Sequence, residues 1–375
     1  MAAARRLVVA ALSLVACGGK GGALSPVGLP QLTHFSGPVL AKVELVTITY
    51  ADDPLRATDE AFGDFVVASD WISAAGKDYG VGPGTHRAKI ELPQSAPAQI
   101  ADYQIDGSLT QWIAQGTVPP PDGETLYLVY FPATTTVTDA ANDAVSCTIA
   151  AGYHSEDQTH SPPFPYAVVP TCPSIDAATA AAEVQGAASH EIMEAATDPY
   201  PISEGTWQLV PTNPWAVALQ GVEVGDLCFP LSELDQGFTL SRIWSNSAAA
   251  AGDDPCLPDQ TSPYHTVYAS PSMPTVQAGG QSEVTLVGWS KGALSPWPIA
   301  VGVGPGLSTG ASFTPTATLS TPTIGVGQTA ALTIQAPQDA QRGATATLLI
   351  LSEPQGYGPG LSGYEALYAM LVTVL

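Results

Sequence analysis

The sequence predicts an α/β domain followed by an all-β, immunoglobulin-like sandwich. Between residues 38 and 261, apolar segments rich in β-branched residues alternate with amphipathic segments of helical period, which is typical of a mixed sheet covered by helices. From residue 262 to 375, short β-rich segments recur about every ten residues between Gly and Pro turns, as in a sandwich. This change of pattern places the expected domain boundary at Ser262 and Pro263.

Helices and strands are expected to alternate in the first domain. Two segments, Asp59–Ala75 and Ala98–Gln115, carry apolar residues at helical spacing, and a proline cluster at 119–121 ends the second. Runs of β-branched or continuous apolar residues predict strands at Val43–Tyr50, Arg87–Leu92, Leu126–Phe131 and Cys147–Tyr153.

The strongest helical signal is the Ala-rich, proline-free segment from Ile175 to Ala196. Ser174 is the expected N-cap, and Asp198-Pro199 ends the helix. A long segment punctuated by proline follows, and a loop of this length within a domain usually carries function.

The second domain shows no cluster of His, Cys or carboxylate residues, so we expect it to act in spacing, binding or stabilisation rather than in chemistry. Its expected strands are Thr266–Ala269, Glu283–Val287, Ile299–Val303, Ala330–Gln335, Ala344–Leu351 and Ala366–Leu375.

The amino terminus has the layout of a bacterial lipoprotein signal peptide. Arg5 and Arg6 precede an apolar run, Leu7–Ala16, that is too short to span a bilayer, and the run closes on Leu14-Val15-Ala16-Cys17, which looks like a lipobox. We expect cleavage before Cys17 and lipidation of this residue, with 18–37 as a flexible tether. The expected location is the cell envelope, facing the periplasm or the cell surface, with lipid as the only membrane anchor. An ordinary secretory peptide with an incidental cysteine is the alternative.

Composition excludes some partners. The formal net charge is -23 while charged residues make up only 12% of the chain, because Lys and Arg are scarce. Nucleic acid and anionic lipid surfaces are therefore poor partners, and a monomer is expected.

Four cysteines remain beside Cys17, and thiols oxidise outside the cytoplasm, so two disulfides are expected. Four cysteines allow three pairings. We favour Cys147 with Cys172 and Cys228 with Cys256, because each pair closes a local loop. A four-cysteine zinc site is the alternative, although the spacing of zinc ribbons is missing.

The segment that could carry chemistry is His190-Glu191-Ile192-Met193-Glu194. Residues four apart lie on one face of a helix, so His190 and Glu194 can hold one metal ion, most plausibly zinc. Glu191 stands where the His-Glu-x-x-His motif of zincins has its general base, whereas Glu194 replaces the second histidine. This predicts a zincin-like mixed sheet with an active-site helix.

A third metal ligand has to come from elsewhere in the chain. Asp226 is the first choice, since Gly225 allows the loop to approach the helix and Cys228 can lock it; Glu223 is the second choice. A calcium site of Glu194, Asp198 and Asp226 is an alternative, because hard carboxylate oxygens suit that ion. Another is that these acids are solvated and bind no metal.

Four motifs occur in order between Gly152 and Cys256, namely Gly152–Ser155, His190–Pro199, Glu223–Cys228 and Trp244–Cys256. Together they resemble the EXORDIUM-like, phosphate-induced protein family. The resemblance covers roughly Pro38 to Cys256 and leaves out the sandwich. Plant members are secreted, cell-wall-associated proteins linked to growth, and bacterial relatives look like zinc peptidases.

This resemblance implies a shared polar centre of His190, Glu191, Glu194 and Asp226, with Asn246 and His154 nearby. His154 would polarise or orient a substrate carbonyl, unless it is a surface residue in a turn. The histidines without a matching context are expected at the surface, namely His34, His86, His160 and His265.

Two functions are therefore expected as alternatives. The first is a zinc-dependent, peptidase-like hydrolase that acts on a peptide or a cell-wall polymer, with Glu191 as general base. The second is a non-catalytic envelope protein whose acidic cluster is structural or binds calcium. The sequence contains no Gly-rich phosphate loop and no Gly-x-Ser-x-Gly elbow.

Overall fold

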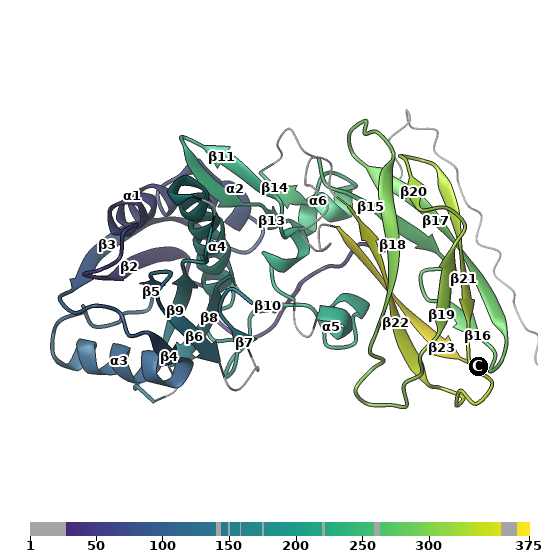
Figure 1. The fold of residues 1–375 in the computed structure, drawn as a ribbon, viewed down its shortest axis with the longest axis horizontal. Coiled ribbons are helices and arrows are strands. Elements are labelled where there is room, and N and C mark those ends of the chain that lie inside the picture. The colour runs from purple at the N-terminus through teal and green to yellow at the C-terminus, as the bar shows by residue number, and fades with distance from the viewer. Residues whose placement is uncertain are drawn as a thin grey trace, which may run out of the picture.

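The computed structural model describes residues 28–139, 144–148, 151–157, 159–174, 176–219, 222–258, 263–353 and 366–375. Figure 1 shows an α/β half adjoining an all-β half. The expected signal peptide, Cys17 and the first part of the tether lie outside these residues. No helix in the described ranges is long and apolar enough to cross a membrane.

A five-stranded mixed sheet forms the centre of the α/β half. Its order is β3-β2-β5-β9-β8, and only the edge strand β8 runs antiparallel to its neighbour. Every residue of β5 and β9 is buried, as expected for strands covered on both faces. The bounds are β2 Lys42–Tyr50, β3 Gly82–Leu92, β5 Thr125–Phe131, β8 Tyr153–Asp157 and β9 Phe164–Pro170.

Helices cover both faces of this sheet (Figure 1). On one face, α1 Arg56–Val66, α2 Asp70–Gly76 and α4 Ala177–Thr197 bury apolar side chains against alternate residues of β2 and β5. On the other face, α3 Asp102–Ala114 packs Ile105 and Leu109 against the remaining residues of these strands. Successive strand residues point to opposite faces, so each strand serves both cores.

Local details differ from the sequence-based expectation at the helices. The helix expected over Asp59–Ala75 is two helices, and the Ser69 hydroxyl donates to the carbonyl of Val66 in the turn between them. The N-cap of α4 is Asp176, not Ser174, because the Asp176 carboxylate accepts from the backbone N–H of Thr179.

The strand expected over Cys147–Tyr153 is wrong. Cys147 lies in a turn with a φ of 62°, and the strand β8 begins only at Tyr153. The structure instead adds the interior strand β9, which carries Pro165 and Pro170 and does not read as a strand in the sequence.

Short elements connect the two halves and complete the α/β half. They are β1 Thr33–His34 with β10 Trp207–Gln208; β4 Gln99–Ala101, β6 Thr136–Asp139 and β7 Ala144–Val145; β11 Ser232–Asp235 with β12 Phe238–Ser241; β13 Ile243–Trp244 with β14 Cys256–Leu257; and the helices α5 Pro214–Leu219, η1 Asp226–Cys228 and α6 Asn246–Ala251.

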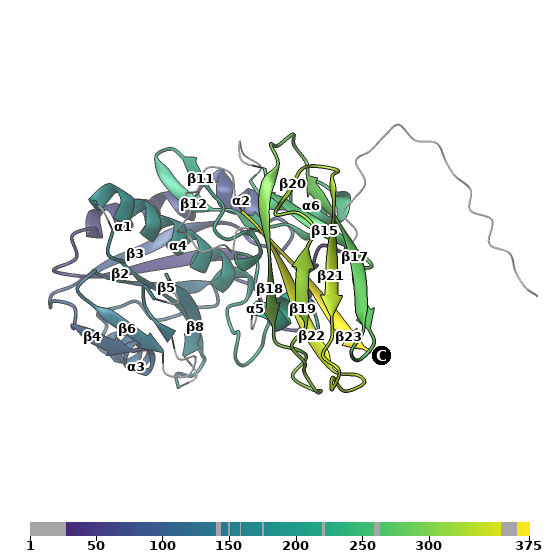
Figure 2. The ribbon, with the colours of Figure 1, turned by 45° about the vertical axis from the view of Figure 1, so that its right-hand side comes forward.

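The all-β half is a sandwich of two sheets, shown in two views in Figures 1 and 2. The sheet orders are β15-β17-β21-β19 and β16-β23-β22-β18-β20. Numbered along the chain, the seven long strands form one sheet of order 1-2-5-4 and one of order 7-6-3, which is the order of the ABED and GFC sheets of immunoglobulin domains. Their bounds are β15 His265–Ser270, β16 Thr275–Val276, β17 Gln281–Ser290, β18 Trp297–Gly304, β19 Thr316–Leu319, β20 Thr323–Ile324, β21 Thr329–Gln335, β22 Thr345–Ser352 and β23 Leu367–Val374.

Two disulfides link Cys147 to Cys172 and Cys228 to Cys256, which is the pairing favoured from the sequence. The second disulfide is fully buried. Disulfides persist in oxidising compartments, so the chain is an extracytoplasmic protein. The four-cysteine zinc site is therefore wrong, because all four thiols are consumed.

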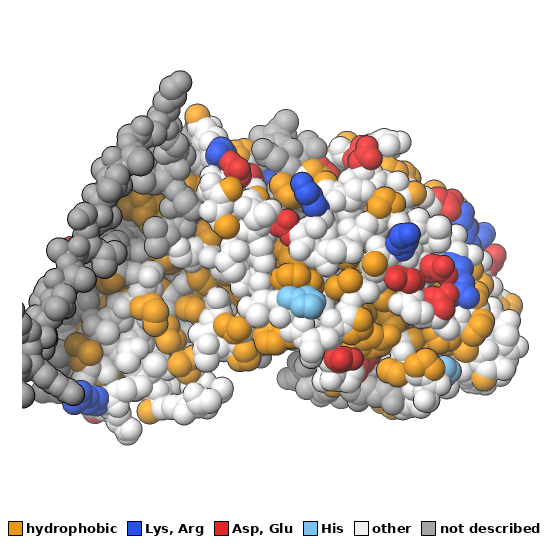
Figure 3. Space-filling view, turned by 180° about the vertical axis from the view of Figure 1, so that it is seen from behind, with side chains coloured by type: hydrophobic (Ala, Val, Ile, Leu, Met, Phe, Trp, Pro, Cys, Tyr) orange, Lys and Arg blue, Asp and Glu red, His pale blue; other side chains and the backbone are white. Residues whose placement is uncertain are grey.

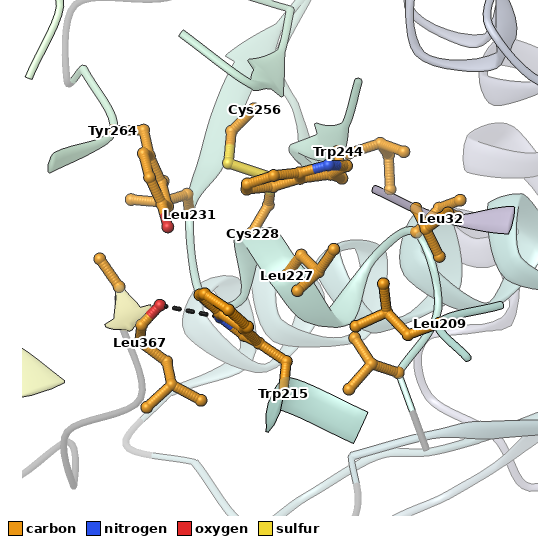
Figure 4. Close-up of a cluster of buried hydrophobic side chains, with 14 of the residues drawn as sticks. Leu32, Leu209, Trp215, Leu227, Cys228, Leu231, Trp244, Cys256, Tyr264 and Leu367 are labelled. Atoms are coloured by element: carbon orange, nitrogen blue, oxygen red, sulfur yellow. Dashed lines mark hydrogen bonds between the residues drawn. A yellow bond between two sulfur atoms is a disulfide. The ribbon is translucent and has the colours of Figure 1, made fainter. Parts of the chain in front are cut away.

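The two halves share one hydrophobic core (Figure 4). Trp215 of α5 donates its indole N–H to the carbonyl of Leu367 over 3.1 Å, and its ring meets that of Tyr368 edge-on at 5.2 Å. Trp244 packs edge-on against Tyr264 beside the buried disulfide. The sandwich is thus joined to the segment that follows α4, not attached through a free linker.

The surface matches the low content of basic residues. On the face seen in Figure 3, charged side chains of both signs lie mainly over the α/β half and are sparse over the visible part of the sandwich. Basic side chains form no stripe there that would follow a nucleic-acid backbone.

Candidate metal centre

The last two turns of α4 bring the candidate residues into the interior. Ile192, Met193 and Ala196 of these turns are fully buried in the core, so the opposite side of the helix is held close to β8 and to the loop before η1. His190 and Glu194, one helical turn apart, have side chains that are 12% and 6% exposed. Their polar atoms therefore face a site largely shielded from water.

Asp226 meets the helix as expected from the sequence. His190 Nε2 lies 3.1 Å from Glu194 Oε1 and 3.6 Å from Asp226 Oδ1. Ligand atoms at about 2.0–2.1 Å around a tetrahedral zinc ion are roughly 3.3 Å apart, so both distances from His190 Nε2 are close to what one ion requires. Ligand atoms of the three residues all lie within 4.8 Å of one another. The Asp226 side chain is 40% exposed, which leaves this side of the group open to solvent.

His154 of β8 faces the same helix from the sheet. Its Nδ1 lies 3.7 Å from Glu191 Oε2 and 3.9 Å from Glu194 Oε2, and its Nε2 lies 3.5 Å from Glu223 Oε2. The imidazole is 6% exposed. The alternative of a surface histidine in a turn is therefore wrong for His154.

Two glycines make these approaches possible. A Cβ on Gly225 would lie 2.6 Å from Cε1 of His190, and a Cβ on Gly152 would lie 2.9 Å from Oε1 of Glu191. Gly225 has an ordinary helical φ of -80°. The requirement at Gly225 is therefore space for the imidazole, not a special turn conformation.

The loop that carries Asp226 is fixed from several directions. Glu194 Oε1 accepts the backbone N–H groups of Gly225 at 3.1 Å and Asp226 at 3.3 Å. The backbone N–H of Trp244 donates to the carbonyl of Val224 over 2.9 Å, and the buried disulfide at Cys228 follows directly. The loop is thereby tied both to α4 and to the core shared with the sandwich.

Asp198 connects the end of α4 to the chain beyond it. Its Oδ1 accepts the backbone N–H of Thr206 over 2.7 Å, and its Oδ2 accepts the side-chain amide of Gln208 over 2.5 Å. Its carboxylate also contacts Glu223. Among the described residues, Asp198 is not grouped with Glu194 and Asp226 as a set of close ligand atoms, so a calcium site of these three residues stays a prediction.

Asn246 also lies outside the centre. Its side chain accepts the backbone N–H of Leu32 and donates to the carbonyl of the same residue, at 2.9 and 2.8 Å. The place near the polar centre that the family resemblance implies for Asn246 is not what its contacts show. It fastens the start of the described chain to α6.

Two of the four remaining histidines are not at the surface. The side chain of His86 is 3% exposed and lies 2.9 Å from Asp64 Oδ1, and His265 is 5% exposed with Nε2 2.9 Å from the carbonyl of Glu353. The surface expectation is wrong for both, because each ring is packed under a neighbouring element. His34 is exposed and His160 is partly exposed.

Electrostatics at the centre favour bound cations or protons. Burial lowers the pKa of His190, but the charge of Glu194 and the contact with Asp226 outweigh it, so this pKa lies well above its usual value. The pKa of His154 is likewise raised by Glu191 and Glu194 against the effect of burial. Burial, then the charge of Glu194, raises the pKa of Glu223 well above its usual value.

The sequence does not predict that the Glu223 carboxylate lies beside His154. It suggests Glu223 only as the second choice for a metal ligand. The backbone N–H of Glu223 donates to Asp226 Oδ2 over 3.1 Å, which holds the two acids of this loop close together. An acid three residues before a turn-forming aspartate is the sequence signal that would have indicated this.

Comparison with known proteins gives little. No protein-family model and no curated protein matches the chain. An MSP family member of C. elegans matches with 11% identity over 29% of this chain and 97% of its own, at a TM-score of 0.21. The CsuC-CsuE chaperone-tip adhesion subunit complex of Acinetobacter baumannii gives 16% identity, 29% and 51% coverage and a TM-score of 0.21. The S-layer protein rSbsC matches with 12% identity over 46% of this chain and 24% of its own, at a TM-score of 0.21. Scores this low establish no shared fold.

Proposed function

We propose that this chain is an exported, zinc-dependent hydrolase of zincin-like architecture, held at the cell envelope by lipid on Cys17. His190, Glu194 and Asp226 would be the zinc ligands. The observation that carries the proposal is the spacing of 3.1 and 3.6 Å from His190 Nε2 to the two carboxylates. The proposed resemblance to the EXORDIUM-like family implies the same residues, which supports the choice of site.

The residues around the three ligands suit hydrolysis. A bound zinc ion would make a water molecule more acidic and polarise a carbonyl group. Glu191, buried on the same helix as His190 and Glu194, would take the proton from the attacking water. His154, whose Nδ1 faces Glu191 and Glu194 and whose Nε2 lies 3.2 Å from the carbonyl of Asp198, would help to orient the substrate carbonyl beside the ion.

A peptide is the substrate class that the surroundings support best. The strand β8, which carries His154, is the edge of the mixed sheet and pairs only with β9 in the described part of the chain. An extended peptide can pair with such an edge through its main chain. Several carboxylates line the centre, so a neutral or basic peptide fits better than an acidic polymer.

A second candidate is a non-catalytic envelope protein. The raised pKa of His190 allows a protonated imidazole to bridge Glu194 and Asp226 without metal, as a purely structural ion pair. This alternative predicts a folded protein that binds no zinc and depends on His190 for stability alone.

Zinc content and peptide hydrolysis of the purified soluble chain separate the two candidates. We expect stoichiometric zinc and cleavage of a mixed peptide library by the unmodified protein. His190→Ala should lose cleavage and the zinc ion held with Glu194 and Asp226, whereas Glu191→Gln should lose cleavage and keep that ion. Glu183→Gln, on the exposed start of α4, is the matched control and should change neither. Absence of zinc from the correctly folded chain would favour the second candidate.

A further inference from the structure

We propose that the centre holds a second divalent cation, bound by His154, Glu191 and Glu194 and bridged to the first ion through the Glu194 carboxylate. This inference rests on the proposed first position at His190, Glu194 and Asp226. It changes the centre from a one-metal to a two-metal hydrolytic site.

The two oxygens of Glu194 face different partners. Oε1 lies 3.1 Å from His190 Nε2, whereas Oε2 lies 3.9 Å from His154 Nδ1. A carboxylate that presents one oxygen to each of two ligand groups has the geometry of a bridge between two ions. Two-metal hydrolytic sites hold their ions about 3.5–4 Å apart, a distance that a bridging carboxylate spans.

One shared ion does not account for both histidines. In the described residues, ligand atoms within 4.8 Å of one another form a group of His154, Glu191 and Glu194 and a group of His190, Glu194 and Asp226. Glu194 belongs to both groups, and neither group contains both imidazoles. The arrangement therefore defines two positions, not one four-ligand position.

The three side chains of the second group are all buried. The side chains of His154, Glu191 and Glu194 are 6%, 8% and 6% exposed. His154 Nδ1 and Glu191 Oε2 are 3.7 Å apart, too far for a direct hydrogen bond and suitable for two ligands of one ion. Glu191 Oε1 lies beside Gly152, so the two oxygens of this carboxylate face different neighbours.

The carboxylates of the two groups lack basic partners other than histidine. In the described chain, Glu191, Glu194 and Asp226 pair only with His154 and His190, and not with Lys or Arg. Bound cations would compensate the charge of these largely buried carboxylates.

Zinc binding to the metal-free, soluble chain, measured by equilibrium dialysis with elemental analysis, tests this proposal. About two zinc ions per chain are expected, and His154→Gln should reduce the number to about one. Gly152→Ala should also remove one ion, because its Cβ displaces Glu191 and does not touch the first position. The control His160→Gln should keep both, and near-UV circular dichroism checks the fold of each variant.

The outcomes separate this proposal from the proposed function. One zinc ion that is unaffected by His154→Gln and Gly152→Ala, and is lost in His190→Gln, overturns the second position and leaves the first. No zinc in the folded, unmodified chain overturns both. In the cobalt-substituted protein, the two ions bridged by Glu194 should be magnetically coupled. Gly152→Ala should abolish this coupling.

Discussion

The imidazole of His190 lies directly against the backbone of Gly225, where an added Cβ would approach Cε1 to 2.6 Å. Gly225→Ala should therefore push the imidazole away from Asp226 while the fold remains. We expect zinc affinity to fall by about 10- to 100-fold, as for other losses of ligand orientation. Gly107→Ala, at an exposed position of α3, is the control, because no atom lies within 4 Å of its added Cβ. Unchanged affinity in Gly225→Ala would place the zinc elsewhere.

Zinc binding should depend on pH through His190. The pKa of this imidazole is raised by Glu194 and Asp226, despite burial, so the metal-free protein carries a proton there at neutral pH. Metal needs the neutral imidazole, and binding should release about one proton or more at pH 7. Calorimetric titration in buffers of different ionisation heat measures this number. Binding heats that do not vary with the buffer would contradict it.

The raised pKa of His190 also affects the stability of the metal-free protein, with a pH dependence opposite to that of zinc binding. The charged His190 stabilises the native state fully below the unfolded pKa of about 6.5, and this stabilisation is lost as pH rises through the higher folded value. Metal-free protein should thus become less stable toward alkaline pH as its zinc affinity rises. Urea unfolding of the metal-free chain and of His190→Gln across this range checks the sign.

Trp215 should couple the stability of the two halves. It is 4% exposed and packs from α5 against Leu367 and Tyr368 of β23, within the core that both halves share. Trp215→Ala should lower the free energy of unfolding by about 3–5 kcal/mol. Because the core is continuous, calorimetry should show one unfolding transition in the unmodified chain. Tyr103→Ala, at a 73% exposed position, should have little effect. Two separate transitions in the unmodified chain would contradict a shared core.

Asp59 at the start of α1 should destabilise the protein at alkaline pH. It is 1% exposed, and neither carboxylate oxygen has a hydrogen-bond partner. Burial and the charge of Asp53 raise its pKa to about 8, so stability is lost as pH rises from the unfolded value of about 4 to 8. Asp59→Asn should stabilise by roughly 3–5 kcal/mol at pH 9 and about 1–2 kcal/mol at pH 5. Urea unfolding measures this, with the exposed Asp70→Asn as control. An equal effect at both pH values would refute the assignment.

The sequence predicted those parts of the fold that local patterns determine. The strands β2 and β5 and the helix α4 follow from apolar runs and an Ala-rich segment. The strand β9 was missed because its two prolines suggest a loop, whereas its burial between β5 and β8 is a tertiary effect.

The candidate site divides in the same way. Helical spacing alone places His190 and Glu194 together, and the glycine before Asp226 indicated a close approach of the loop. The orientation of Asp198 toward Thr206 and the burial of His86 depend on residues distant in sequence. Neither leaves a periodic signal, so neither could be predicted from the chain.

The most direct test of the central claim is an anomalous difference map at the zinc edge from crystals of the zinc-loaded protein. We predict a peak about 2.0–2.2 Å from His190 Nε2 and from carboxylate oxygens of Glu194 and Asp226. A fully occupied zinc peak at other residues, with no density among these three side chains, would contradict the account.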